Sequence, residues 1–250
     1  KDIVNKEDRN VTEIDASGLQ CPGPIMQVYN KMEELKDGDI LKVTATDPGF
    51  EKDIEAWCDT TGNTLLDIKK EDNELQVTLQ KGDTIEQSSA VRAESESSSE
   101  KTGKTMVVFS GELDRALASF IIANGAAAMG SDVTLFFTFW GLNILRKDQK
   151  SKVDKTAVEK MFSSMMPQGT KELPLSNMNM FGLGPKMIRK VMKDKNVDSL
   201  EVLIRQAKQN GVRLVACQMS MDLMGIKKEE LIDGVDVGGV ATFLNASDDS

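Results

Sequence analysis

One segment near the middle of the chain cannot form a packed core, and it limits what the rest can fold into. Residues 87–104 contain six serines and no aromatic residue. Such a segment buries too little apolar surface to offset the entropy lost on ordering, so we expect a flexible tether. The 250 residues then fall into two blocks of ordinary domain size. We predict a small domain at 1–82, a Ser/Glu-rich linker at 83–104 and a larger domain at 105–250.

The small block alternates short strands with amphipathic helices. Its apolar spacing predicts the order βαβαββ, with both helices on one face of a four-stranded sheet in a two-layer sandwich. Strands are expected at 11–16, 40–46, 64–68 and 75–79, and helices at 22–35 and 50–62. Cys58 lies beside Trp57 on the apolar face of the second helix, so we expect a buried structural cysteine.

The large block contains strands that are apolar throughout, separated by helical patterns. Continuous apolar strands are typical of a parallel sheet that is covered on both faces. We therefore predict an α/β domain with a doubly wound parallel sheet. Strands are expected at 105–109, 133–138 and 212–217, helices at 113–129, 156–166, 185–192 and 199–210, and a short strand or turn feeding a helix at 235–244.

Composition excludes several kinds of chemistry. The chain has no histidine and three cysteines, none of them in a Cys-x-x-Cys pair. A Ser-His-Asp triad, a Cys-His protease pair, a zinc ribbon and a thioredoxin-type dithiol are therefore excluded. The segment 178–184 is too poor in glycine for a dinucleotide-binding fingerprint, so we expect no nicotinamide site. We expect no other cofactor, and no metal.

Cysteine usage and hydropathy predict the compartment. Three cysteines in 250 residues are too few for a disulfide framework, which favours a reducing environment. The first 13 residues are charged throughout rather than forming a secretory signal, and the longest apolar stretches are shorter than a membrane span. We expect a cytoplasmic protein without a transmembrane segment. Because the sequence starts at Lys1, we also expect that it is part of a longer polypeptide.

Negative charge is concentrated in the first block. Residues 1–80 hold 9 Lys and Arg against 18 Asp and Glu, a net charge of −9 that equals the total for the chain. Such an acidic surface repels phosphate backbones, so we expect no nucleic-acid partner. Two interpretations remain open: docking onto the basic face of a partner protein, or simple solubility.

Cys21 precedes a predicted helix that opens with two prolines. In the run Cys21-Pro22-Gly23-Pro24-Ile25, the prolines lose nothing in a first turn and leave the amides of Gly23 and Ile25 to point towards the sulfur. A helix N-terminus stabilises an anion, so the thiol pKa is expected to fall and the sulfur to be nucleophilic. The alternative is a capping cysteine without chemistry.

The residues around Cys21 resemble the TusA/SirA-like sulfur-carrier family. The resemblance covers nearly all of residues 10–80, and its Cys-Pro-x-Pro motif is specific. It implies the two-layer βαβαββ fold, and it implies that Cys21 carries sulfane sulfur as a persulfide for transfer to a partner. The matching residues are Gly18 to Pro24, Gly38-Asp39, Asp47-Pro48-Gly49-Phe50, Asp53-Ile54, Trp57 and Thr61-Gly62-Asn63.

Cys217 ends an apolar strand of the large block and is followed by Gln218 and Ser220. In open α/β sheets, ligand and catalytic groups gather at the carboxyl ends of strands, and Ser220 or Asp222 could cap a following helix near the sulfur. The alternative is a cysteine that is simply the last buried residue of a strand. Methionines are also frequent between 161 and 192, where core filling and loop packing are favoured over a sulfur-binding pocket or an adaptable contact surface.

The large block resembles the DsrE/DsrF-like family over about residues 104–246. The resemblance rests on Val107 to Gly111, Phe136 to Gly141 and Ala216 to Met221. It implies that Cys217 accepts or donates sulfur, and that this domain forms homo-oligomers. It also implies partners among rhodanese and CoA-disulfide reductase modules, to which such domains are fused in other proteins.

These observations lead to one function and two alternatives. The chain is predicted to traffic sulfur as a sulfurtransferase-like persulfide carrier, with Cys21 and Cys217 as the two stations and the linker bringing them together. Pro22, Gly23, Pro24, Ile25, Gln218 and Ser220 are expected to support the thiols. The alternatives are a non-catalytic interaction module attached to a reductase or rhodanese, and a thiol–disulfide redox protein that uses Cys21 and Cys217 as a pair.

Overall fold

The computed structural model describes residues 10–20, 22–71, 74–82, 103–149 and 153–248. Its contacts divide the chain into two compact units, which we call the N-terminal and the C-terminal unit. Cys21 and residues 83–102 of the predicted linker lie outside the described residues. Within the described ranges, no helix is both long enough and apolar enough to cross a membrane.

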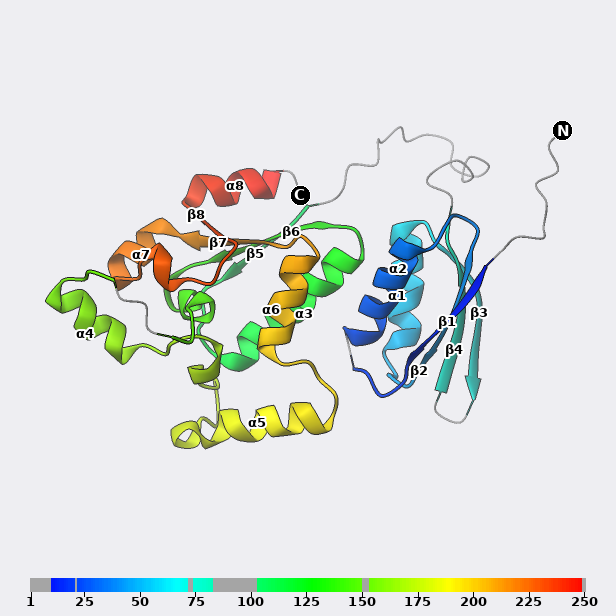
Figure 1. The fold of residues 1–250 in the computed structure, drawn as a ribbon, viewed down its shortest axis with the longest axis horizontal. Helices are drawn as coiled ribbons and strands as arrows, with labels where there is room; N and C mark the ends of the chain where they lie inside the picture. Colours follow the sequence, from blue (N-terminus) through cyan, green and yellow to red (C-terminus); the bar gives the residue numbers. More distant parts are fainter. Residues whose placement is uncertain (1–9, 21, 72–73, 83–102, 150–152, 249–250) are drawn as a thin grey trace. The chain divides into compact units, whose positions relative to one another are not determined.

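The N-terminal unit is the expected two-layer sandwich. Its sheet has the order β1-β2-β4-β3, in which β1 pairs with β2 in parallel and the other neighbours are antiparallel. Both helices lie on one side of this sheet (Figure 1). The elements are β1 (Val11–Ala16), α1 (Gly23–Glu34), β2 (Ile40–Ala45), α2 (Phe50–Thr61), β3 (Thr64–Glu71) and β4 (Glu74–Gln80).

The core of this unit lies between the two helices and the sheet. Phe50, Ile54 and Trp57 repeat on one face of α2, and each side chain is at most 2% exposed. Burial of a large apolar side chain stabilises the fold by about 1.5–3 kcal/mol. The helix stops at Gly62, whose φ of +72° is a left-handed C-cap that a glycine adopts without strain. Cys58 is 4% exposed beside these residues, as predicted.

The C-terminal unit is built on a four-stranded parallel sheet. Its strand order is β5-β6-β7-β8, and every neighbouring pair is parallel. The strands are β5 (Gly103–Val108), β6 (Asp132–Phe137), β7 (Arg213–Cys217) and β8 (Val235–Gly238). The α-helices are α3 (Leu113–Ala128), α4 (Ala157–Met165), α5 (Leu183–Asp194), α6 (Leu200–Gln209), α7 (Gln218–Met224) and α8 (Val240–Asp248).

Helices cover this sheet on both faces, as expected, but unequally. The helices α3 and α6 lie against one face, and α8 lies against the other (Figure 1). The buried Asn124 of α3 donates a hydrogen bond to the carbonyl of Leu203 in α6, at 3.0 Å, and so joins the two helices. The order β5-β6-β7-β8 runs without reversal. Right-handed crossovers that advance in one direction place their helices on one face, which leaves the other face to α8.

A 3₁₀ segment that the sequence pattern did not predict follows β6. This segment, η1 (Phe139–Leu145), buries Leu142, Ile144 and Leu145 completely. Gly141 lets it approach the sheet, because a Cβ at this position would collide with the carbonyl oxygen of Val108 at the end of β5. The carboxyl ends of β5 and β6 are therefore packed against η1.

Candidate functional site

The loop before α1 is fixed at the carboxyl ends of β1 and β2. The Gly18 amide donates to Thr46 Oγ1 at 2.7 Å, which ties the loop to the residue that follows β2. The Ser17 amide donates to the Asp15 carboxylate at 2.8 Å, and the Ser17 hydrogen bonds hold the pKa of Asp15 below its usual value. Leu19 closes the turn through its amide to the Ala16 carbonyl, at 3.2 Å. The residues that lead to Cys21 are thus well anchored.

The start of α1 corrects one sequence-based expectation. Pro22 occupies the N-cap position, and no side chain caps the helix. The Gly23 amide donates to the Gln20 carbonyl at 2.8 Å, so it is not available to a sulfur at position 21 as expected. If the N-terminus of α1 stabilises a thiolate at position 21, the amide of Ile25 must provide the hydrogen bond.

The prolines and Ile25 also contribute to packing. The side chains of Pro22, Pro24 and Ile25 are all buried, and Ile25 belongs to the core of the N-terminal unit. They hold the start of α1 against the unit, directly after position 21. Their supporting role towards the Cys21 thiol remains a prediction, because Cys21 lies outside the described residues.

Two carboxylates lie at the same end of the N-terminal sheet. Asp47 follows β2, is 8% exposed, and accepts a hydrogen bond from the Gly49 amide at 3.1 Å. Burial raises the pKa of Asp53, and the negative charge of Asp47 adds to this effect. The sequence contained a signal for this pair. Asp47 lies just before α2 and Asp53 lies in its first turn, and this helix follows a parallel strand.

Cys217 lies at the carboxyl end of β7 and is buried. Its side chain is 3% exposed in a small cluster with Phe136 and Val215, against which Phe243 of α8 packs. The rings of Phe136 and Phe243 are 5.3 Å apart between centroids. The Cys217 thiol therefore lies on the face of the sheet that α8 covers. Neither of the described cysteines, Cys58 or Cys217, forms a disulfide.

Gln218 and Ser220 both belong to α7, but the first side chain is exposed and the second is buried. Ser220 is completely buried, and its hydroxyl shares a hydrogen bond of 2.7 Å with the hydroxyl of Thr138. The expectation that Ser220 or Asp222 caps the helix is wrong, because α7 begins at Gln218 and Cys217 itself is the N-cap residue. Gln218 is exposed, and its side-chain amide donates to Asp222 at 2.9 Å. The sequence did not indicate this contact of Thr138, which directly follows β6.

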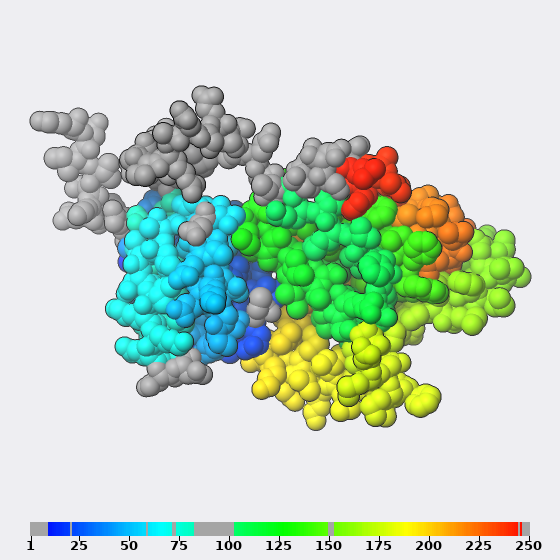
Figure 2. Space-filling model, turned by 180° about the vertical axis from the view of Figure 1, so that it is seen from behind, coloured from blue at the N-terminus to red at the C-terminus, as the bar shows by residue number. Residues whose placement is uncertain are grey.

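The sequence favoured core filling and loop packing for the methionines between 161 and 192, but most of them are exposed. Met166 and Met192 are buried, at 7% and 9% exposure. The more exposed ones lie in α4, in the short η3 (Met180–Gly182) with its preceding loop, and in α5; they are Met161, Met165, Met178, Met180 and Met187. In Figure 2, the yellow residues of α5 stand out at the surface. Their exposure argues against core filling and agrees better with a role in contacts at the surface.

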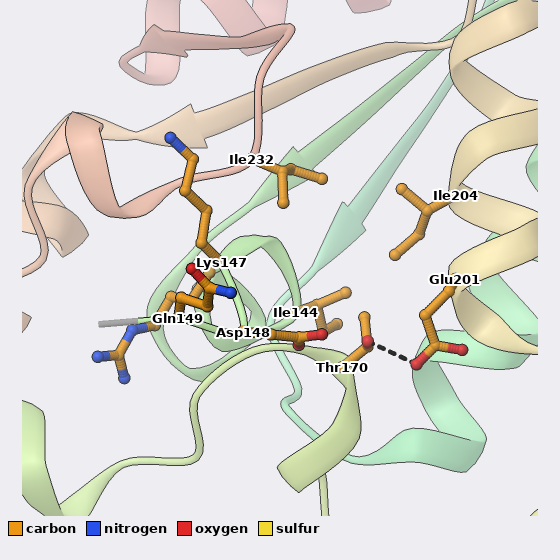
Figure 3. Close-up of a pocket in the computed structure, with 9 residues that line it drawn as sticks. Ile144, Lys147, Asp148, Gln149, Thr170, Glu201, Ile204 and Ile232 are labelled. Atoms are coloured by element: carbon orange, nitrogen blue, oxygen red, sulfur yellow. Dashed lines mark hydrogen bonds between the residues drawn. The ribbon is translucent and has the colours of Figure 1, made fainter. Parts of the chain in front are cut away.

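One cavity of the C-terminal unit has no cysteine among its described lining residues. It measures about 400 Å³ and lies beside α6, as Figure 3 shows. In its wall, the Thr170 hydroxyl donates to the Glu201 carboxylate at 2.6 Å. Its other lining residues are Ile144, Arg146, Lys147, Asp148, Gln149, Ile204 and Ile232. Within the described residues, no group of three or more Cys, Asp or Glu side chains is arranged to hold a metal ion.

Comparison with known protein families gives two matches that together cover most of the chain. Residues 100–250 match the model of the DsrE/DsrF/DrsH-like family. Residues 12–81 match the model of the sulfurtransferase TusA. The two matched regions correspond to the C-terminal and N-terminal units described above.

Individual relatives agree with this division. The uncharacterized protein YrkE of Bacillus subtilis is 54% identical over 140 residues, which are 56% of this chain and 88% of the relative. The sulfur carrier protein DsrE2 of Allochromatium vinosum is 36% identical over 149 residues, 58% of this chain and 92% of its own. The sulfur carrier protein TusA of the same organism is 41% identical over 69 residues, covering 28% of this chain and 91% of the relative.

Proposed function

The chain belongs to the DsrE/DsrF/DrsH-like family and carries a TusA domain before it, and from this premise we propose that it relays sulfane sulfur between Cys21 and Cys217. Its relatives include DsrE2 and TusA of Allochromatium vinosum, which are both named sulfur carrier proteins. These names support sulfur trafficking as the general role. The proposal adds the chemical form of the cargo, a cysteine persulfide, and the two residues that hold it.

The proposed transfer needs a thiolate nucleophile and a thiolate leaving group. The Cys21 thiolate attacks the outer sulfur of a donor persulfide, the sulfur–sulfur bond of the donor breaks, and the donor leaves as a thiolate. Cys21 then holds the extra sulfur as a persulfide. The Cys217 thiolate attacks that outer sulfur in turn and releases Cys21 as a thiolate. The electrons balance at each step without an external oxidant, and no histidine is required.

The position of Cys217 is the observation that carries this proposal. The thiol ends β7 at the carboxyl edge of the parallel sheet, in a cluster against which Phe243 of α8 packs. Its low exposure means that α8 must move before another thiol can reach it. Val240 and Leu244 of this helix are 63% and 51% exposed, so α8 leaves part of its apolar surface unburied, and we propose that it opens to admit a thiol. Elements with few buried contacts are the ones that open locally.

The partners and compartment belong to the same proposal. We expect donors or acceptors that are rhodanese or reductase modules, a homo-oligomer formed through the C-terminal unit, and a cytoplasmic location. Exposed Phe109 and Trp140, at 60% and 53%, support an apolar contact surface on this unit.

Persulfide loading tests the relay. The full chain is incubated with a small-molecule persulfide, and the sulfur on each cysteine-containing peptide is located by mass spectrometry. We expect wild type to gain sulfur on Cys21 first and on Cys217 later, and Cys21→Ser to leave Cys217 unloaded. Cys58→Ser is the matched control and should load as wild type. Loading of Cys217 at the wild-type rate in Cys21→Ser would contradict the relay order.

The burial of Cys217 favours a second candidate function. A thiol at 3% exposure that never becomes accessible would make the C-terminal unit a non-catalytic interaction module. In that case Cys217 would acquire no sulfur even after long incubation with loaded Cys21, and α8 would protect it from small alkylating reagents as well. The loading experiment therefore separates the two functions.

A further inference from the structure

A second cavity of the C-terminal unit is lined mainly by cations and hydrogen-bond donors. It measures about 160 Å³ and lies beside α4, away from the cluster that contains Cys217. The residues of its wall that matter here are Arg146, Lys155, Lys160, Ser163, Gln168 and Glu230. Three of these are cationic and one is a carboxylate, so the wall carries a net positive charge.

Most of this charge is buried. The side chains of Arg146, Lys155 and Glu230 are only 2%, 7% and 7% exposed. Lys155 Nζ lies 2.6 Å from one carboxylate oxygen of Glu230, and Arg146 Nη2 lies 3.5 Å from the other. Two buried cations thus share one carboxylate. An uncompensated buried charge is costly, so this arrangement favours an additional anion.

The hydrogen-bond pattern points in the same direction. The Ser163 hydroxyl oxygen accepts from Arg146 Nη2 at 3.1 Å and from Lys155 Nζ at 2.9 Å. Its own proton must therefore point to a third group, and among the described residues no acceptor for it is found. The buried Arg146 Nε also has no acceptor in that part of the chain. A buried donor such as Arg146 Nε normally has a partner.

We propose that this cavity binds a small oxoanion, such as sulfate, thiosulfate or phosphate. An oxoanion supplies the missing negative charge and several acceptor oxygens for Ser163, Lys155 and Lys160, and such charge-assisted hydrogen bonds are strong. A water molecule takes about 30 Å³ in the liquid, so a cavity of about 160 Å³ has room for the five heavy atoms of a tetrahedral ion. The proposal does not depend on the sulfur relay.

The bound ion would also attach α4 to the rest of the unit. Ser163 and Lys160 belong to α4, whereas Arg146 follows η1 and Glu230 ends the short segment η4 (Lys228–Glu230). No side chain of α4 is buried, so its attachment depends strongly on polar contacts. An ion that bridges these elements should therefore slow the exchange of the α4 amides.

Calorimetric titration of the full chain tests the site. Sulfate, thiosulfate and phosphate are titrated separately against chloride at equal ionic strength, and hydrogen exchange of α4 is measured in the same solutions. We expect at least one oxoanion to bind while chloride does not. Ser163→Ala and Lys160→Gln should each weaken its affinity about tenfold, as loss of one charge-assisted hydrogen bond would. Lys190→Gln removes an exposed cation of α5 as the matched control and should bind as wild type.

Two further comparisons identify the ion and show whether its binding is independent of the sulfur relay. Preference for thiosulfate would make the ligand a sulfur compound, and preference for phosphate would make it a phosphate. Cys217→Ser should bind the ion unchanged, because Cys217 does not line this cavity. Absence of binding by all three oxoanions would overturn the proposal. Equal binding by wild type and by both cavity variants, with folding verified by circular dichroism, would also overturn it.

Discussion

The two described cysteines are almost equally buried, yet they are buried in different ways. Cys58 is 4% exposed and lies on α2, within the main core of the N-terminal unit. Cys217 is 3% exposed and lies at the end of a strand, in a cluster of three buried residues that α8 covers. We therefore expect exposure of Cys58 to require unfolding of the N-terminal unit, and exposure of Cys217 to require only movement of α8. Accessible area alone therefore does not determine which thiol can react.

Weakening the N-terminal core should have the largest effect and should act on Cys58 alone. Ile54 is completely buried one turn before Cys58, and Ile54→Ala leaves a cavity that costs about 2–5 kcal/mol. We expect pulsed alkylation of Cys58 to accelerate by more than about tenfold, with Cys217 unchanged. Mass spectrometry of the two peptides measures both rates in one sample.

Glu55→Ala changes the neighbouring exposed residue and serves as the control. It should leave the alkylation rate of Cys58 close to that of wild type. A Cys58 rate that does not respond to Ile54→Ala would mean that this thiol becomes exposed without unfolding of the core, and the contrast with Cys217 would disappear.

Weakening the contact of α8 should act on Cys217 alone. Phe243 is the α8 residue that packs against the Cys217 cluster, and its partial exposure suggests that Phe243→Ala costs about 2 kcal/mol. If this cost falls on the docking of α8, alkylation of Cys217 should accelerate about 30-fold, with Cys58 unaffected. The same pulsed alkylation experiment measures the effect.

Leu244→Ala is the matched control for Phe243→Ala, because Leu244 is the next residue of α8 and is 51% exposed. It should change the Cys217 rate by less than about twofold, as most exposed substitutions change stability little. If Phe243→Ala accelerates both cysteines equally, Cys217 becomes exposed by global unfolding, and the proposed opening of α8 is wrong.

The regular elements of both units could be predicted from the sequence because their signals are local. Ile54 and Trp57 are spaced to share a helix face, and the apolar run that ends at Cys217 has the length of a buried strand. Gly62 and Thr156 mark where helices end and begin, through a left-handed cap and a capping box.

What could not be predicted depends on contacts between distant residues. Gly141 allows η1 to pack against β5, and no local pattern indicates which carbonyl it meets. Ser220 bonds to Thr138, which lies 82 residues earlier, so sequence alone suggested a cap instead. Arg146 precedes β7 in the chain and Glu230 follows it, yet their side chains form an ion pair. The position of the Cys21 sulfur remains a prediction from its motif.

Acid should loosen the start of α4 through one carboxyl group, whereas the apolar cores described above contain no such group at their centre, which would extend the contrast between peripheral helices and packed centres. The capping hydrogen bonds from Thr156, together with Lys227 at 3.0 Å, lower the pKa of Glu159 from 4.5 to about 2. A lowered carboxyl pKa stabilises the folded state above pH 4.5, and this contribution is lost as the pH falls through about 2. We expect the Glu159 carboxyl to titrate near 2 by NMR, with fraying of the first turn of α4 over the same range.

Two variants test this assignment. Glu159→Gln should abolish the pH dependence of the first turn of α4, and Lys227→Met should move the titration of Glu159 towards 4.5 without abolishing the capping box. A Glu159 carboxyl that titrates at its ordinary value in wild type would show that the capping geometry does not persist in solution.

The smallest expected effect concerns Asp53, and it tests whether the N-terminal unit opens as one body. Burial and the charge of Asp47 raise the pKa of Asp53 above 3.8, so its ionised form is disfavoured in the folded state. The resulting contribution is fully present below pH 3.8 and is lost as the pH rises through the higher folded value. Asp53→Asn should therefore stabilise the unit at pH 7 by less than about 1 kcal/mol, since solvent screens much of the interaction.

Alkylation of Cys58 detects this gain because it depends on unfolding of the whole unit. At pH 7 Asp53→Asn should slow the Cys58 rate, while the Cys217 rate stays at the wild-type value. In thermal unfolding the stabilisation should disappear below pH 3.8, where the wild-type carboxyl is itself protonated. Glu51→Gln, an acid in the same first turn of α2, is the control and should not stabilise the unit. A slower Cys217 rate in Asp53→Asn would mean that the two thiols share one opening event, which contradicts their different burial.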